Sequence, residues 1–219
     1  MIKAEGIKKS YENIEVLKGI DLSINKSEIV SIVGASGAGK STLLHILGTL
    51  DNADSGKVWI DDIEISKLGQ KKLSDFRNKK IGFVFQAHHL LPEFSALENI
   101  MMPAWIAKTS KGQAHSKALE LLALMKLEHR KDHRPSELSG GEQQRVAVCR
   151  ALVNNPVVVF ADEPSGNLDS QAAQELHKLF FDLRAKFGQT FVIVTHNNEL
   201  AGMADRKLVM KDGSMLVNA

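Results

Sequence analysis

Hydrophobic and polar positions alternate along the first third of the chain in short runs separated by turn residues. The alternation predicts strands over residues 2–8, 12–17 and 20–24, and the uninterrupted apolar run at 29–33 predicts a buried strand. Glycines follow this run directly, and leucines then recur at helical spacing over 43–48. The chain is therefore expected to open with strands, a glycine-rich loop and a helix.

The next segment adds short strands and one more buried strand. Residues 58–60 and 63–65 are expected to be edge strands around a turn at Asp61 and Asp62. The apolar run at 81–85 predicts a buried strand that ends at Gln86.

From residue 95 to residue 154 the pattern is helical, most clearly over 118–125 and 140–153. Because strands are predicted on both sides of this stretch, we interpret it as an inserted helical subdomain.

Strands return in the last third of the chain. The apolar runs at 157–161 and 191–194 predict buried strands. Residues 207–210 are expected to pair with 215–217 around a turn at Asp212–Gly213.

The composition is that of an ordinary globular domain. The chain has 219 residues, of which 43% are hydrophobic and 25% charged, and these values disfavour disorder, coiled coils and disulfide scaffolds. The 28 basic and 26 acidic residues leave a net charge of +2, which gives no electrostatic reason to expect a nucleic-acid partner. The densest basic cluster, at 129–134, is expected to be a solvated loop.

The single cysteine, Cys149, lies in an apolar helical pattern and is expected to be a core residue in a reducing compartment. The N-terminus lacks the apolar stretch of a signal peptide, and no apolar run approaches the roughly 20 residues of a membrane span. We therefore expect a cytoplasmic protein whose link to a membrane, if any, is through a partner.

The glycine-rich stretch after the strand at 29–33 satisfies the pattern GxxxxGK[ST]. Glycines let consecutive backbone N–H groups turn inward around phosphates at a helix N-terminus. Lys40 would add a positive charge at the β- and γ-phosphates, Ser41 would ligate Mg²⁺, and Thr42 would reach the α-phosphate. The residues of this candidate phosphate loop are Gly34, Ala35, Ser36, Gly37, Ala38, Gly39, Lys40, Ser41 and Thr42.

Two acids, Asp162 and Glu163, follow the apolar strand at 157–161. At a strand end such a pair is often only a turn or a helix cap, but the upstream phosphate loop favours chemistry. Asp162 would hold Mg²⁺ through its hydration shell, and Glu163 would polarise the water that attacks the γ-phosphate.

Residues 138–145 read Leu-Ser-Gly-Gly-Glu-Gln-Gln-Arg. Ser139, Gly140 and Gly141 would open a helix whose free N–H groups and dipole attract an anion, although the same residues also suit an ordinary helix cap. The stretch resembles the LSGGQ signature of the ABC ATPases, with Glu142 in place of the commoner glutamine.

Further positions resemble this family in the expected order. Tyr11 looks like the aromatic that stacks on adenine, with Val16 beside it. Gln86 resembles the Q-loop glutamine that reaches Mg²⁺ and the water. Asp169 ends a stretch, 165–169, that resembles the D-loop at the dimer interface, and His196 resembles the switch histidine that donates to the γ-phosphate.

The resemblance implies an α/β fold with a phosphate-loop NTPase core, a mainly parallel sheet, an N-terminal antiparallel β subdomain and an inserted helical subdomain. The domain would be a single one, 1–219, with the core and β subdomain in 1–94 and 155–219 and the signature subdomain in 95–154. It also implies an ATPase that uses ATP and Mg²⁺. Two copies would associate head to tail, each signature closing on the other copy's ATP.

The segment 87–100 bears on the membrane partner that this resemblance implies. It reads Ala-His-His-Leu-Leu-Pro-Glu-Phe-Ser-Ala-Leu-Glu-Asn-Ile and resembles the ATPases of lipoprotein-releasing systems, whose partners would be LolC/LolE-like subunits at the inner membrane. FtsE-type division ATPases, with an FtsX-like partner, and MacB-type exporters share parts of it and remain alternatives. A soluble ABC ATPase acting on DNA or ribosomes would need an insertion or a tandem unit. His88 and His89 are not expected to bind a metal, because adjacent side chains diverge.

Overall fold

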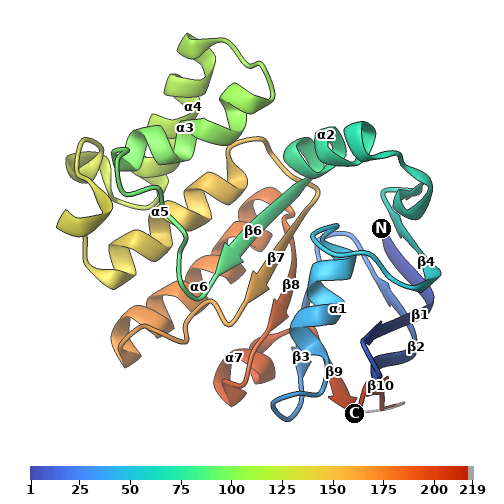
Figure 1. The fold of residues 1–219 in the computed structure, drawn as a ribbon. Helices are drawn as coiled ribbons and strands as arrows, with labels where there is room; N and C mark the ends of the chain where they lie inside the picture. The colour runs from blue at the N-terminus through green and yellow to red at the C-terminus, as the bar shows by residue number, and fades with distance from the viewer. Residues whose placement is uncertain (217–219) are drawn as a thin grey trace.

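Two β-sheets, with helices packed around and between them, make up the fold in the computed structural model, which describes residues 1–216 (Figure 1). The strands are β1 Ile2–Tyr11, β2 Ile14–Ile24, β3 Ile29–Val33, β4 Ser55–Ile60, β5 Ile63–Glu64, β6 Ile81–Phe85, β7 Val158–Asp162, β8 Thr190–Val194, β9 Arg206–Lys211 and β10 Ser214–Met215. The helices are α1 Lys40–Leu47, α2 Gln70–Lys80, α3 Ala96–Ile106, α4 Lys111–Leu124, α5 Gly140–Leu152, α6 Ser170–Phe187 and α7 Asn198–Met203.

The N-terminal sheet is antiparallel, in the order β2-β1-β4-β5. The strands predicted at 12–17 and 20–24 form one strand, β2, because Gly19 at φ +90° and register shifts in the β1–β2 pairing carry the ladder past the expected break. The prediction that β4 is an edge strand is wrong: it pairs with β1 on one side and β5 on the other, so of the two predicted edge strands β5 alone lies at an edge of the sheet.

The second sheet is mainly parallel, in the order β10-β9-β3-β8-β7-β6. Only the terminal hairpin, β9–β10, is antiparallel within it. Of the predicted hairpin, Val217 lies outside the described residues. Because the other strands run the same way, the carboxyl ends of β3, β6, β7 and β8 meet at one edge, which is where ligands bind in such sheets.

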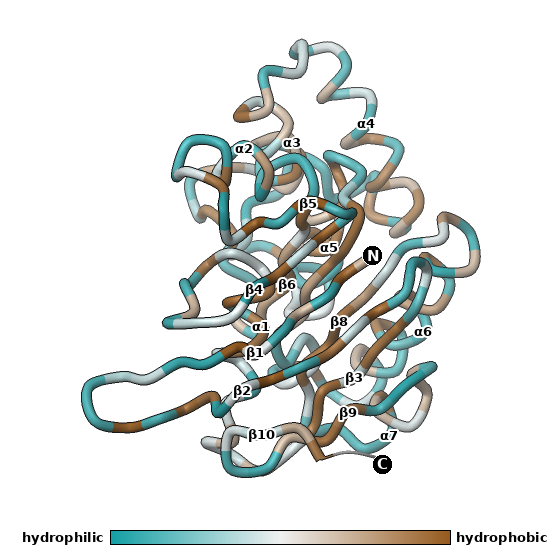
Figure 2. The backbone as a smooth tube through the Cα atoms, turned by 90° about the vertical axis from the view of Figure 1, so that its right-hand side faces the viewer, coloured by the Kyte–Doolittle hydropathy of each residue, from teal (hydrophilic) through white to brown (hydrophobic). Residues whose placement is uncertain are grey.

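Side chains of each parallel strand alternate between two hydrophobic cores, one on each face of the sheet. In β7, Val158 and Phe160 pack with α1 and the antiparallel sheet, whereas Val159 and Ala161 pack toward α5 and α6. The cores give the brown stretches along the strands in Figure 2. Helix α1 lies between the two sheets, which fixes the phosphate-loop end of the helix relative to both.

Helices α3, α4 and α5 occupy 96–152 and stand beside the parallel sheet (Figure 1). Cys149 is fully buried there, as expected. Helices α2, α6 and α7 were not predicted, although the buried residues Ala173, Leu176, Phe180 and Leu183 give α6 a clear helical period. Within residues 1–216, no helix combines the length and the apolar character that crossing a bilayer requires.

Candidate active site

The glycine-rich stretch forms a tight loop between β3 and α1. Gly37 and Gly39 have φ of +78° and +94°, a backbone conformation that favours glycine. A Cβ at Gly39 would lie 2.9 Å from the carbonyl oxygen of Val16, so the β1–β2 hairpin could not pack over the loop with a larger residue there. Local conformation and close packing together account for this glycine.

Lys40 begins α1 and folds back over the loop. Its Nζ donates to the carbonyl oxygens of Gly34 and Ala35, both at 2.9 Å. Two carbonyls thus hold the ammonium group inside the curve of the loop. An ammonium in this place is suited to an anion that also meets the loop's N–H groups.

A cavity of about 570 Å³ lies over this loop. It is lined by Tyr11, Val16, Gly34, Ser36, Gly37, Gly39, Lys40, Ser41, Thr42, Glu163 and His196. The structure therefore brings together most of the predicted cofactor-binding residues, drawn from both sheets. Ala35 and Ala38 do not line the cavity; the Ala38 side chain is buried in the core.

Ser41 and Asp162 meet at the floor of the site. The Ser41 hydroxyl donates to Asp162 Oδ1 at 3.1 Å, and His45 Nε2 lies 3.7 Å from Asp162 Oδ2. Burial raises the pKa of Asp162 above its ordinary value, against the opposing effect of the Ser41 hydrogen bond. A hydroxyl and a carboxylate are oxygen ligands of the kind that a hard cation such as Mg²⁺ prefers. Because burial makes the carboxylate costly to ionise, a bound cation would stabilise its charged form.

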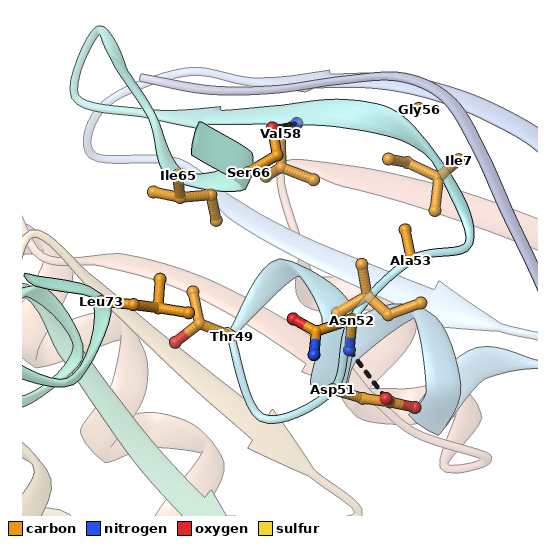
Figure 3. A pocket seen from close by; sticks show the side chains of 11 residues that line it. Ile7, Thr49, Asp51, Asn52, Ala53, Gly56, Val58, Ile65, Ser66 and Leu73 are labelled. Carbon is orange, nitrogen blue, oxygen red and sulfur yellow. Dashed lines mark hydrogen bonds between the residues drawn. The ribbon is translucent and has the colours of Figure 1, made fainter. Parts of the chain in front are cut away.

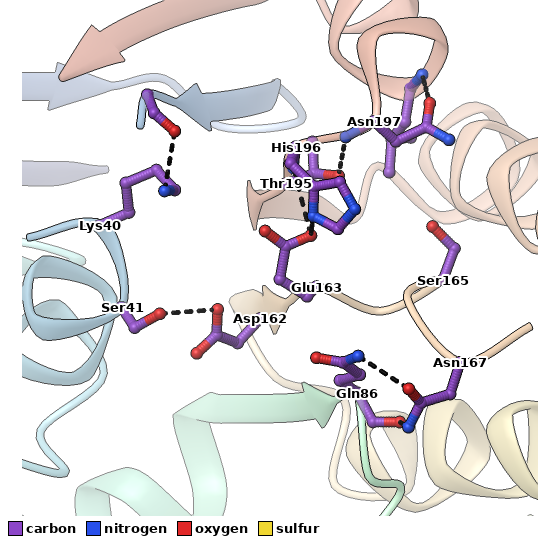
Figure 4. Close-up of polar contacts among 12 residues, drawn as sticks. Lys40, Ser41, Gln86, Asp162, Glu163, Ser165, Asn167, Thr195, His196 and Asn197 are labelled. Carbon is purple, nitrogen blue, oxygen red and sulfur yellow. Dashed lines mark hydrogen bonds and ion pairs between the residues drawn. The ribbon is translucent and has the colours of Figure 1, made fainter. Parts of the chain in front are cut away.

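Glu163 and His196 form the opposite wall. Oε2 of Glu163 lies 2.8 Å from His196 Nδ1 and also accepts the backbone N–H of His196 at 3.2 Å (Figure 4). The backbone of Glu163 is left-handed, with φ +46°, and its N–H donates to the carbonyl of Val194 at 2.9 Å. Two adjacent strand ends therefore set the direction of this carboxylate.

Gln86 follows β6 and is next to this acidic pair, since Phe85 pairs with Asp162 in the ladder. Its side chain points to Asn167: Gln86 Nε2 donates to Asn167 Oδ1 at 2.8 Å, and Asn167 Nδ2 donates to the Gln86 carbonyl at 3.2 Å. Among the described residues, no hydrogen bond joins Gln86 to Ser41 or Asp162. The structure places the predicted metal ligand Gln86 near them but bonded elsewhere.

The signature residues lie apart from the phosphate loop. Ser139 caps α5: its hydroxyl accepts the N–H of Glu142, and the Glu142 carboxylate accepts the N–H of Ser139 at 2.8 Å. Asp169 caps α6 in turn, accepting from the N–H of Ala172 at 2.8 Å. A second cavity is lined by Ser139, Gly140, Gly141, Arg145, Asn167, Leu168, Asp169, Gln171, Ala172 and Glu175, and it shares no residue with the first.

The segment after Gln86 is held to the helices by two residues that were not predicted. Arg150 of α5 donates to the carbonyls of His88 and His89 at 2.7 and 2.6 Å, and both histidines have left-handed backbones. The buried Asn99 of α3 accepts the N–H of Leu91 at 2.8 Å and donates to three nearby carbonyls.

Arg150 also lines a groove of about 400 Å³ between the core and helices α3 and α5. The groove is lined by Leu50, Ser74, Arg77, Asn78, Ile81, Gly82, Phe83, Phe85, Pro103, Ile106, Arg150, Ala151 and Asn154. The adjacent histidines do not belong to a group of metal ligands. Among the described residues, no three or more acidic, histidine or cysteine side chains are grouped so that they could hold a metal ion, and this includes His88 and His89.

One residue of the site and one pairing were not predicted. His45 is four residues after Ser41 on α1, so helix geometry alone could have placed both on the face that meets Asp162. Asn167 lies in the stretch 165–169 that resembles the D-loop, but its hydrogen bond to Gln86, 81 positions away, is not indicated by any local pattern.

Comparison with known proteins gives one consistent result. The ABC transporter family matches residues 17–166. A Cytophaga hutchinsonii protein named lipoprotein-releasing system ATP-binding protein LolD is 60% identical over 99% of both chains. A Bacteroides thetaiotaomicron protein of the same name is 61% identical over 98% of this chain and 99% of its own.

A solved dimeric ATP-binding cassette, in a post-hydrolysis state bound to ADP and Pi, has the same fold. It superposes with a TM-score of 0.91 at 40% identity, covering 99% of this chain and 97% of its own. The predicted α/β fold is thereby confirmed, and so is the resemblance to ABC ATPases. The chain belongs to the ABC transporter family and is one of its ATP-binding, ATP-hydrolysing cassettes.

Proposed function

We propose that this cassette is the ATP-hydrolysing subunit of a transporter that releases lipoproteins from the inner membrane. The observation that carries this proposal is the identity of 57–61% to four proteins named LolD, over at least 97% of this chain and of theirs. Neither an FtsE-type nor a MacB-type function receives such support from these relatives' names.

Different residues of the site bind the phosphates, the Mg²⁺ ion and the adenine base. Lys40 and the loop N–H groups bind the β- and γ-phosphates, and Thr42 lies beside them toward the α-phosphate. Ser41 and Asp162 would hold Mg²⁺, which would neutralise developing charge on the phosphates. Tyr11 would stack on adenine, with Val16 as an apolar contact.

Glu163 is placed to orient the attacking water. As water attacks the γ-phosphorus, the bond to the β-phosphate oxygen breaks, and Glu163 takes up the water's proton. His196, fixed against Glu163 at 2.8 Å, stabilises charge on the γ-phosphate. The Gln86 side chain must break its hydrogen bond to Asn167 to reach the water. Asn167 would therefore be its hydrogen-bond partner before the water is engaged.

The active site is completed by a second copy of the chain. The signature and the phosphate loop line separate cavities within one chain, so Ser139, Gly140 and Gly141 would meet the γ-phosphate of the partner copy. The free N–H groups at the start of α5, together with the positive end of the helix dipole, would attract this phosphate. Asp169, at the start of α6 and on the rim of the signature cavity, would lie at this interface.

The groove between the core and helices α3 and α5 is the place proposed for the membrane subunits, which would be LolC/LolE-like. Leu50 and Ile106 line it with exposed apolar side chains, and Leu91, also exposed, belongs to the segment that Arg150 and Asn99 hold. Burying such side chains favours a protein partner. The cassette would thereby be held at the cytoplasmic face of the inner membrane.

Reconstitution tests this function. The cassette, co-purified with its native membrane subunits, is placed in proteoliposomes loaded with a lipoprotein, and release is measured on addition of ATP and Mg²⁺. We expect release that stops in Glu163→Gln. Co-purification with an FtsX-like subunit, or hydrolysis without release from a complete complex, would contradict the proposal.

A further inference from the structure

Tyr11 ends β1 at the tip of the β1–β2 hairpin, and the residue is 46% exposed. An exposed aromatic at a hairpin tip has few neighbours to fix its plane. Its hydroxyl, however, donates to Asp51 Oδ2 at 2.5 Å. The ring therefore has one defined attachment, forty residues away in the chain.

Asp51 belongs to the segment that follows the phosphate-loop helix. The backbone N–H groups of Leu50 and Asp51 both donate to the carbonyl of His45, at 2.8 and 3.3 Å, so this segment is fixed to the last turn of α1. Figure 3 shows the segment beneath the antiparallel sheet, with the Asp51 carboxylate also accepting the N–H of Asn52. Asp51 thus connects the hairpin tip to the helix that starts at Lys40.

Lys9 completes the arrangement. Lys9 lies two residues before Tyr11 on β1, and a register shift between Lys9 and Ser10 separates them in the ladder. The Lys9 ammonium lies 5.0 Å from the centre of the Tyr11 ring, at cation–π distance, and donates to Asp51 Oδ1 at 3.2 Å and to the Asn52 carbonyl at 2.7 Å. One face of the ring is therefore covered, and the opposite face remains for a base.

Charge favours this arrangement. Burial alone would raise the pKa of Asp51, but hydrogen bonds from Tyr11, Asn52 and Lys9 outweigh it and lower the pKa below its ordinary value. The same hydrogen bond raises the pKa of Tyr11. At neutral pH the phenol is a donor and the carboxylate an acceptor, which is the pairing that the geometry needs.

We propose that Asp51 is a positioning residue for the nucleotide: by accepting the Tyr11 hydroxyl, it sets the ring that receives the base at a fixed place relative to the phosphate loop. Lys9 holds the other face of the ring. This inference rests on the adenine-stacking role proposed above for Tyr11. A ring fixed in advance costs less ordering on binding, so the contribution is to affinity and not to the chemical step.

The experiment compares Asp51→Ala, Tyr11→Phe and the double variant in the full-length cassette. Affinity is measured for ATP and, as a probe without a base, for inorganic tripolyphosphate, and KM and kcat are measured alongside. We expect Asp51→Ala to weaken ATP binding and raise KM about 3- to 10-fold, the size of an ordinary net hydrogen-bond contribution, with kcat within about twofold. Affinity for tripolyphosphate stays within about twofold, because the phosphate loop is untouched.

The double variant provides the decisive comparison. If Asp51 acts through the Tyr11 hydroxyl, its removal adds nothing once Tyr11→Phe has removed that hydroxyl. An equal loss of affinity in the Tyr11→Phe background would overturn the proposal. A parallel loss for tripolyphosphate would also overturn it, because general damage to the loop would then be the cause.

Asp54→Ala is the matched control. Asp54 is on the same segment. Its carboxylate accepts the N–H of Ser10 at 2.6 Å and lies 3.7 Å from the Lys9 ammonium, but it makes no hydrogen bond to Tyr11. We expect ATP affinity within about twofold of the parent in this variant, since Lys9 keeps its hydrogen bonds to Asp51 and Asn52 and the Tyr11 hydroxyl keeps its acceptor. A loss equal to that of Asp51→Ala would assign the effect to hairpin attachment and overturn the proposal.

Tyr11→Ala separates this inference from the function on which it rests. If Tyr11→Ala leaves ATP affinity unchanged, the stacking role is wrong, and the positioning role is wrong with it. If Tyr11→Ala weakens ATP binding but Asp51→Ala does not, only the positioning role is wrong. Should Asp51→Ala fail to fold, Asp51→Leu, which also lacks an acceptor for the Tyr11 hydroxyl, and Tyr11→Phe allow the same comparison.

Discussion

Glu163 Oε2 and His196 Nδ1 lie 2.8 Å apart at the ends of two neighbouring parallel strands. Neither residue could hold this position from its own segment alone. The β7–β8 ladder brings Asp162 opposite Val194, and Glu163 and His196 follow each strand just beyond that pair. The sheet register therefore assembles the pair on which hydrolysis is proposed to depend.

Glu163→Gln should abolish turnover while leaving ATP binding intact. The amide keeps the shape of the side chain but cannot take up the proton of the attacking water, and loss of such a base costs about 100-fold or more in rate. Phosphate release measures the rate, and size-exclusion chromatography with ATP should show a trapped dimer. Glu120→Gln, on the exposed face of α4, is the control, and steady-state hydrolysis retained in Glu163→Gln would remove Glu163 from its assigned role.

Two inactive variants should restore each other's activity when mixed. Lys40→Ala removes the ammonium group with which the phosphate loop binds the nucleotide. Gly141→Asp places a carboxylate where the partner's γ-phosphate is expected. In a mixed head-to-tail dimer, one site has an intact loop and an intact signature. With random pairing and independent sites, activity should reach at most about a quarter of the parent's.

The mixture is measured by ATP hydrolysis against each variant alone. No recovery, although mixed dimers form, would mean that the two cavities do not complete one site across the dimer.

Asp162→Asn should make the metal-free protein more stable at neutral pH. The folded state raises the pKa of Asp162 above the ordinary 3.8, so it holds this proton more tightly than the unfolded chain does. Ionisation therefore lowers stability as pH rises from 3.8 through the higher folded value, and the loss persists above it. Asparagine has no such ionisation.

Thermal unfolding between pH 4 and 8 in EDTA checks this sign. We expect the variant's advantage in Tm to grow as pH rises from 4, to level off above the folded pKa of Asp162, and to be about 2–4 °C at pH 7. In a separate assay, Asp162→Asn should have lost magnesium-dependent ATP hydrolysis. An advantage that shrinks as pH rises would contradict the burial argument.

Arg150→Met should free the segment that carries His88 and His89. It removes two hydrogen bonds from a charged donor, and the left-handed backbones of both histidines would lose their main attachment to α5. Hydrogen exchange at 87–91 should become faster while α5 itself stays protected.

Arg77→Met is the matched control, because Arg77 lines the same groove but donates to the carbonyl of Thr49 at 2.7 Å. If exchange at 87–91 responds equally to both substitutions, Arg150 has no particular hold on this segment.

Most of the parallel core could be predicted because its strands are continuous apolar runs. The strands at 29–33 and 81–85 were predicted with the bounds that they have, and the helix after Gly39 and the hairpin turn at Asp61–Asp62 followed from local residue preferences. The continuous strand β2 was not predicted, since register shifts in its hairpin with β1 carry it past Gly19. The interior place of β4 was not predicted, since it depends on pairing with the distant strand β1. Periodicity is local, and sheet order is not.

For the site, the sequence by itself determined which residues could bind phosphate, because a glycine loop, a lysine and a helix start act through neighbouring atoms. Only the tertiary structure decided which distant residues face one another: Glu163 against His196, Gln86 against Asn167, and Asp51 against Tyr11. It also separated the signature from the phosphate loop by placing them on different cavities. The physical reason is that contacts across 33, 81 and 40 residues depend on strand register and helix packing, which no local pattern encodes.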